Sequence, residues 1–224
     1  MKKIFFPLLF VVLVPASSCS VLRNYTLNEQ DAAAAIRQLL EIGTRDGSLN
    51  GSFSKDVIMS TVFPESVKKA LNTLNQLGLT PEIDRFTSTM SLAAEKTAER
   101  SIPIFVNAIT GMSFNDAIRI VKGGGTSATD YLRAAVGTQL RQSITPVMQT
   151  ALDEYKLNEQ WKKMTAPVQT MLGNRVNLDL ANLMAGVVSE SMFKKIAEKE
   201  VQVRSNASAR TTSLLRKVFG RNWN

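Results

Sequence analysis

The chain has 224 residues, of which 44% are hydrophobic and 21% are charged, and its formal net charge is +8. This is the composition of an ordinary globular protein, and the length suffices for one sizeable core without requiring a second domain. The sequence contains no histidine. Catalytic triads built on histidine and the usual histidine-based metal sites are therefore excluded, and we expect neither a metal ion nor a cofactor.

The N-terminal stretch has the layout of an export signal. Two lysines precede an apolar run, residues 4–14, that is too short to span a bilayer comfortably. Small residues at 16–18 lead into Cys19, the single cysteine of the chain. This arrangement resembles a bacterial lipobox, which implies cleavage before Cys19 and attachment of lipid to its sulfur. The alternative is an ordinary secretory signal that is cut near Ser17 and leaves Cys19 a free thiol.

We accordingly divide the sequence into a signal peptide (1–18), a lipidated cysteine with its tether (19–27) and an all-helical domain (28–224). Ser20 stands where an aspartate is associated with retention in the inner membrane. The expected location is therefore the outer membrane, with the domain facing the periplasm. The expected partner at this end of the chain is the membrane itself, reached through acyl chains on Cys19.

The rest of the chain predicts an all-α fold, a single multi-helix domain resembling a bundle. Apolar residues recur every three or four positions, and no run of alternating β-branched residues indicates a strand. Caps, prolines and glycines place the ends of the helices, beginning with a capping box formed by Thr26 and Glu29. The expected helical segments are 26–43, 64–78, 80–109, 113–122, 126–155, 158–173, 180–203 and 210–220.

The segment 80–109 carries the most regular apolar stripe, with its members three or four residues apart from Ile83 to Ile109. Such a stripe is typical of a core-facing helix. The small side chains of Ala94 and Ala98 allow a neighbouring helix to approach closely. Pro103 is expected to break or kink this helix, because it lacks an N–H and clashes with the preceding turn.

Several short motifs occur in a fixed order along the chain. They are Leu92-Ala93-Ala94-Glu95, Ile104-Phe105, Met112-Ser113, Asp116-Ala117, Thr126 after a triple glycine, and Arg210-Thr211-Thr212 ahead of Val218-Phe219-Gly220. In this order they resemble the bacterial domain-of-unknown-function family 4197, from about Ala33 to Gly220. The resemblance implies a helical, exported protein. It implies no particular activity, because that family carries no established one.

The first candidate site is the turn Gly123-Gly124-Gly125, followed by Thr126 at the predicted start of a helix. Exposed N–H groups at a helix start hold phosphates and carboxylates. A phosphate loop also needs a preceding strand and a G-K-[ST] ending, and both are missing. We favour the alternative, a tight turn between two helices, because Asp130 already complements the helix dipole and repels an anion.

The second candidate site is a set of charged residues on otherwise apolar helices. In a hydrolase or lyase, Glu95 or Asp116 would transfer protons while Tyr131 or arginines hold an anionic substrate. As structural elements, the same residues would form ion pairs and caps, which we favour because no nucleophile stands out. Glu200 and Arg204 are four apart, a spacing worth about 0.3–0.5 kcal/mol when the pair is exposed. The candidate anion-binding residues are Gly124, Gly125, Thr126, Arg133, Arg204 and Arg210.

From Glu190 onward the chain carries eight basic and three acidic side chains. This basic end suits anionic lipid head groups or another polyanion, or it is a solvated helix surface; nucleic acid is not an expected partner.

The nine methionines either fill the core or line a cavity for a hydrophobic ligand. The sequence thus favours a non-enzymatic envelope lipoprotein whose partner is a hydrophobic ligand, an envelope protein or a cell-wall polymer. The enzyme with Glu95 or Asp116 is the alternative.

Overall fold

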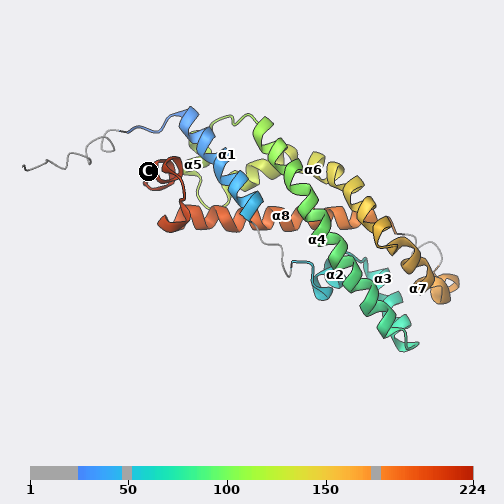
Figure 1. Ribbon diagram of the computed structural model, residues 1–224. Coiled ribbons are helices and arrows are strands. Elements are labelled where there is room, and N and C mark those ends of the chain that lie inside the picture. The colour runs from blue at the N-terminus through green and yellow to red at the C-terminus, as the bar shows by residue number, and fades with distance from the viewer. Residues whose placement is uncertain (1–24, 47–51, 173–177, 224) are drawn as a thin grey trace, which may run out of the picture.

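The computed structural model describes residues 25–46, 52–172 and 178–223, and within these ranges it contains α-helices, one short 3-10 helix and no strand (Figure 1). The predicted all-α fold is confirmed. The predicted signal peptide, Cys19 and residues 47–51 lie outside the described residues. The elements are α1 (Glu29–Asp46), α2 (Lys55–Thr61), α3 (Glu65–Gln76), α4 (Thr80–Gly111), α5 (Ala117–Lys122), α6 (Ser127–Glu154), α7 (Leu157–Leu172), α8 (Leu180–Ser205), η2 (Ala207–Ala209) and α9 (Ser213–Phe219).

Three long helices, α4, α6 and α8, pack against one another and form the centre of the molecule. Figure 1 shows α1, α5 and α9 gathered at one end of α8, while α3 and α7 lie together at the opposite end of the molecule. The short helix α2 packs on α4 and was not predicted from the sequence; its N-terminus is capped by the hydroxyl of Ser54. The architecture therefore places the C-terminal half of α8 beside both ends of the described chain.

The apolar stripe on α4 faces the core as predicted. Ile83, Ala94, Ala98 and Ile109 are all buried. Pro103 does not break the helix, which continues to Gly111. A proline inside a helix costs about 3 kcal/mol. The residues that follow it on the stripe are fully buried, so their packing opposes a break at this point.

The first helix starts later than predicted. Asn28 caps α1, because its side-chain oxygen accepts a hydrogen bond of 2.8 Å from the N–H of Asp31. Glu29 consequently does not complete the predicted capping box with Thr26. Its carboxylate accepts the N–H of Ala117 at 2.7 Å instead, and so caps the start of α5 from a distance of 88 residues along the chain.

The first helix also runs past Gly43, which was predicted to end it, and reaches Asp46. Gly43 is buried at the contact between α1 and α8. A Cβ atom at this position would lie 3.1 Å from the Cα of Ile196. The glycine is therefore required by the close approach of two helices rather than by a helix end.

Candidate functional site

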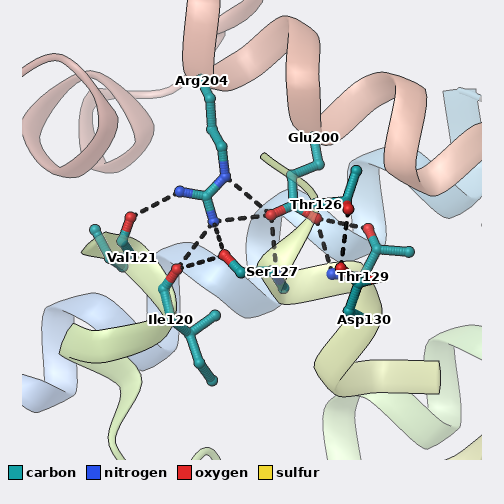
Figure 2. A network of polar contacts seen from close by, with 9 residues as sticks. Ile120, Val121, Thr126, Ser127, Thr129, Asp130, Glu200 and Arg204 are labelled. Carbon is teal, nitrogen blue, oxygen red and sulfur yellow. Dashed lines mark hydrogen bonds and ion pairs between the residues drawn. The ribbon is translucent and has the colours of Figure 1, made fainter. Parts of the chain in front are cut away.

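The glycine turn between α5 and α6 has the backbone that glycine favours, with φ of 67° at Gly124 and 52° at Gly125. The first turn of α6 is not capped by Thr126, whose hydroxyl donates to Asp130 at 2.9 Å. Figure 2 shows instead that the carboxylate of Glu200, on α8, reaches this helix start. An anion binding at this turn would have to displace the protein's own carboxylate.

The Glu200 carboxylate is fully buried, and both of its oxygens are hydrogen-bonded. One oxygen accepts the N–H of Ala128 at 2.9 Å. The other accepts the N–H of Thr129 at 2.8 Å and its hydroxyl at 2.6 Å. Two orphan backbone donors of α6 are thereby satisfied by a charge placed where the helix dipole favours it.

Arg204 lies one turn further along α8 and completes this network (Figure 2). Its Nε donates to Glu200 at 2.9 Å, and its terminal nitrogens donate to the carbonyls of Val121 at 2.7 Å and Ile120 at 3.1 Å. Its side chain is only 12% exposed, and the guanidinium lies 5.0 Å from the ring centroid of Phe219. The pair therefore joins α5, α6, α8 and α9, and it is buried rather than exposed on a helix surface.

The remaining anion-binding candidates lie in two places. Arg210 donates to the carbonyls of Val203 and Arg204, both at 2.9 Å, and so satisfies the C-terminus of α8. Arg133 lies elsewhere, on the face of α6 that is turned toward the middle of α8. It pairs there with Glu190, and its guanidinium stacks 4.5 Å from the ring centroid of Phe193. The six candidates thus do not form one site.

The structure does not bring the two candidate acid–base residues together. Glu95 is exposed in the middle of α4. The end of α4, at Gly111, is 16 residues further on, or about 24 Å along the helix axis, and Asp116 follows beyond it. Asp116 pairs with Arg119 at 2.9 Å. Tyr131 donates to the carbonyl of Ser113 at 3.0 Å and holds the loop ahead of α5.

A groove of about 1090 Å³ lies between α6 and α8, with α2 at its edge; we call it the α6–α8 groove. Four of its lining residues are basic and one is acidic. It is lined by Ser52, Val57, Thr61, Arg133, Gly137, Thr138, Arg141, Leu183, Gly186, Val187, Ser189, Glu190, Ser191, Phe193, Lys194 and Lys195.

Two glycines inside helices line this groove. Gly137 on α6 faces α8, and Gly186 on α8 faces α6. At Gly186, a Cβ atom would lie 3.3 Å from the Cζ of Arg141, so the absence of a side chain lets that guanidinium lie against α8. Arg141 is held there by hydrogen bonds of 3.2 Å to the backbone and side-chain oxygens of Asn182. At Gly137, a Cβ would contact Phe193 at 3.8 Å. Gly186 therefore makes room for Arg141, whereas a Cβ at Gly137 would make only ordinary van der Waals contact.

The charge of the groove is only partly compensated by the protein. Glu190 pairs with Arg133, and Lys195 pairs with Glu198 at 3.0 Å. Arg141 and Lys194 are both exposed, and neither forms an ion pair with any residue that the structure describes. The groove therefore presents an excess of positive charge beside the half-buried apolar side chains of Val57, Leu183 and Val187.

Reasoning from the sequence found Arg133 and placed Lys194 and Lys195 in the basic end, but it missed Gly137, Arg141 and Gly186. An isolated glycine inside a predicted helix indicates close packing, and Gly137 and Gly186 are both such glycines. Among the described residues, no cluster of three or more acidic, cysteine or histidine side chains is placed to hold a metal ion. None of the helices in the described ranges is long and apolar enough to cross a membrane.

Residues 26–220 match the model of a family described as "Protein of unknown function (DUF4197)". Because the match spans most of the sequence, the chain belongs to this family, as its motifs predicted. No curated protein matches the chain, and neither does any solved structure. The groove and the buried network therefore have to be interpreted from their own chemistry.

Proposed function

We propose that the protein is a bacterial envelope lipoprotein whose α6–α8 groove binds an anionic ligand without transforming it. The observation that carries this proposal is the uncompensated charge of the groove. Arg141 and Lys194 line it and form no ion pair with a described residue, whereas Arg133 is paired with Glu190 and Lys195 with Glu198. Clefts lined by charge of one sign raise the local concentration of ligands of the opposite sign.

The lining also favours a ligand with an apolar part. Val57, Leu183 and Val187 are half-buried at the groove and offer apolar surface beside the cations. Binding sites of this size combine apolar walls with a few polar groups that fix the ligand's orientation. A phosphate or carboxylate attached to a hydrocarbon chain or ring satisfies both kinds of surface.

The enzymatic alternative has less support. Glu95 and Asp116 lie outside the groove lining, and the groove's own carboxylate, Glu190, is paired with Arg133. The groove lining therefore offers no carboxylate that is free of an ion pair. If the purified protein showed turnover that was lost in Glu95→Gln or Asp116→Asn while folding was retained, this aspect of the proposal would be wrong.

Location in the envelope is proposed from the N-terminal sequence. Intact-mass measurement of the protein isolated from bacterial membranes should show loss of residues 1–18 and added acyl mass. In Cys19→Ser, the acyl mass should disappear. A wild-type mass equal to the unmodified polypeptide would reject lipidation.

Binding in the groove can be measured by calorimetric titration with dodecyl phosphate below its critical micelle concentration. Inorganic phosphate provides the anion alone, and we expect it to bind more weakly than dodecyl phosphate. The double variant Arg141→Glu/Lys194→Glu should weaken binding of dodecyl phosphate by about tenfold or more.

The matched control is Lys162→Glu/Lys163→Glu, which changes the net charge equally at exposed positions of α7. It should bind dodecyl phosphate as the wild type does. Equal weakening in both double variants would mean that net charge, and not the groove, attracts the ligand. Absence of binding to the wild type would reject the proposed ligand class.

A further inference from the structure

The first described residues of the chain and its last helix form a second basic surface, at the opposite side of the buried network from the groove. We call it the terminal face and define it by Tyr25, Arg216, Lys217, Arg221 and Trp223. The rings of Tyr25 and Trp223 meet edge to face, with centroids 5.8 Å apart. Lys217 lies 3.8 Å from the centroid of Tyr25, and Arg221 lies 5.7 Å and 5.9 Å from the centroids of Tyr25 and Trp223. Figure 1 shows α9 beside the start of α1 at one end of the molecule.

Hydrogen bonds fix the start of the described chain to α9. Asp31 accepts from the hydroxyl of Tyr25 at 2.6 Å and from Lys217 at 2.9 Å. These two bonds hold the pKa of the Asp31 carboxyl below its usual value, whereas burial and the same carboxylate raise the pKa of Tyr25. The indole N–H of Trp223 donates to the carbonyl of Val218 at 2.6 Å. The aromatic and basic side chains of this face are therefore held in one arrangement.

The terminal face carries more positive charge than its own carboxylate can compensate. Asp31 is matched by Lys217. Arg216 is exposed and donates to the carbonyls of Arg210 and Thr211, which leaves its charge in place. Neither Arg216 nor Arg221 forms an ion pair with a described carboxylate. Two guanidinium charges thus remain available to an anionic surface.

The position of this face in the chain relates it to the proposed anchor. Six residue steps separate Cys19 from Tyr25, and a chain extends at most about 3.3–3.6 Å per residue. With acyl chains on Cys19 in a bilayer, Tyr25 lies within about 20 Å of the attachment point. Tryptophan and tyrosine favour the membrane–water interface, and basic side chains are attracted to anionic head groups.

We infer that the terminal face docks on an anionic phospholipid surface, with Trp223 at the interface and Arg216 and Arg221 on the head groups. The inference rests on the proposed lipid at Cys19 for its geometry, but its charges and rings act without that lipid. Docking would give the anchor two components, an acyl group and a basic patch, and would orient the domain relative to the membrane.

The test uses the full chain as cells produce it, reconstituted with vesicles of phosphatidylcholine alone or of phosphatidylcholine with 30% phosphatidylglycerol. Bromine on the lipid acyl chains quenches tryptophans that contact the bilayer. Trp161 is buried and stacks on Phe63 at 5.5 Å, so quenching reports on Trp223, and Trp223→Phe should abolish it. Intact mass determines in the same sample whether Cys19 is lipidated.

We expect quenching on the anionic vesicles and little on the zwitterionic ones. The double variant Arg216→Gln/Arg221→Gln should reduce the quenching. In unlipidated Cys19→Ser chains, the same double variant should weaken vesicle binding roughly 30-fold, because each basic residue near the surface contributes about 1 kcal/mol. The control Lys162→Gln/Lys163→Gln should leave both values unchanged, and circular dichroism should show that every variant is folded.

Lipidated protein without quenching on anionic vesicles would overturn the docking and leave the anchor intact. Wild-type protein that intact mass shows to be unlipidated, and that still binds anionic vesicles through Arg216 and Arg221, would reject the anchor and support the face. Binding that is equal on both kinds of vesicle, or unchanged in Arg216→Gln/Arg221→Gln, would also overturn the inference. A face that instead captures an acidic protein would leave Trp223 unquenched on lipid alone.

Discussion

Two regions of α8, its middle and its C-terminal end, use charged side chains in opposite ways. Toward its C-terminus, Glu200 and Arg204 are buried between other helices, and their polar atoms are bonded to backbone groups of α5 and α6. In its middle, Lys194 and Lys195 border an open groove opposite Arg141. Both regions carry charged side chains on the same helix. Neither the type of these residues nor their spacing in the sequence therefore explains why one region is buried and the other open.

What distinguishes the two regions is the backbone that faces each charge. Glu200 faces the start of α6, where unpaired N–H groups attract a carboxylate. Lys194 lines the groove between α8 and the interior turns of α6, whose backbone groups already bond one another. A charge opposite a helix end becomes a fixed component of the structure, whereas a charge opposite a helix middle stays available to solvent and ligands.

The largest effect that tests this comparison is expected for Glu200→Ala. The change leaves Arg204 buried without its partner and two N–H groups of α6 uncapped, so the free energy of unfolding should fall by about 3–5 kcal/mol. Chemical denaturation measures this loss. Glu198→Ala is the matched control, because Glu198 is exposed and its one ion pair among the described residues is with Lys195; the loss should stay below about 1 kcal/mol. Similar losses in both variants would contradict the distinction.

A smaller effect is expected for the ion pair between Asp31 and Lys217. This pair is half-buried, so its exposure is intermediate between that of the buried network and that of the groove cations. The pKa of Asp31 is lowered in the folded state, so its contribution to stability is complete above the unfolded pKa of about 3.9 and is lost as pH falls through the folded pKa. Asp31→Asn should therefore destabilise the protein by about 1 kcal/mol at pH 7.

Denaturation as a function of pH tests that expectation. The difference between wild type and Asp31→Asn should shrink as pH decreases below about 4. A difference that stays constant down to pH 2 would mean that Asp31 contributes through its shape rather than its charge.

The smallest effect on stability is expected in the groove. Arg141→Glu/Lys194→Glu removes no buried contact and should change the free energy of unfolding by less than about 1 kcal/mol, even though it weakens ligand binding. Thermal unfolding of this variant beside wild type measures it. A loss comparable to that of Glu200→Ala would mean that the groove cations are structural, and the comparison between the two regions of α8 would fail.

The local pattern of the sequence was sufficient for most of the fold. The stripe from Ile83 to Ile109 predicted the buried face of α4 because its spacing follows one side of a helix whatever packs against it. The errors at Thr26 and Gly43 and the continuation of α4 past Pro103 have a common cause. In each case a partner distant in the sequence, or the burial of neighbouring side chains, outweighed a local signal.

The sites were less accessible to reasoning from the sequence, because they depend on how helices pack. The spacing of Glu200 and Arg204 was recognised, but their burial depends on α6 starting against α8. Thr126 was the local choice for a cap, and a residue 72 positions away from Ala128 performs that role. Arg141 and Lys194 are 53 positions apart, and only the contact between α6 and α8 makes them neighbours of one groove.

The cap formed by Glu200 also bears on the order in which the protein acquires its structure. Residues 128 and 129 are synthesised 72 and 71 positions before the carboxylate that completes their helix turn. At 5–20 residues per second, roughly 4 to 14 seconds pass before that carboxylate exists. Over this interval the α6–α8 contact is out of reach, so the nascent chain remains unable to form the groove until nearly all of it has been made.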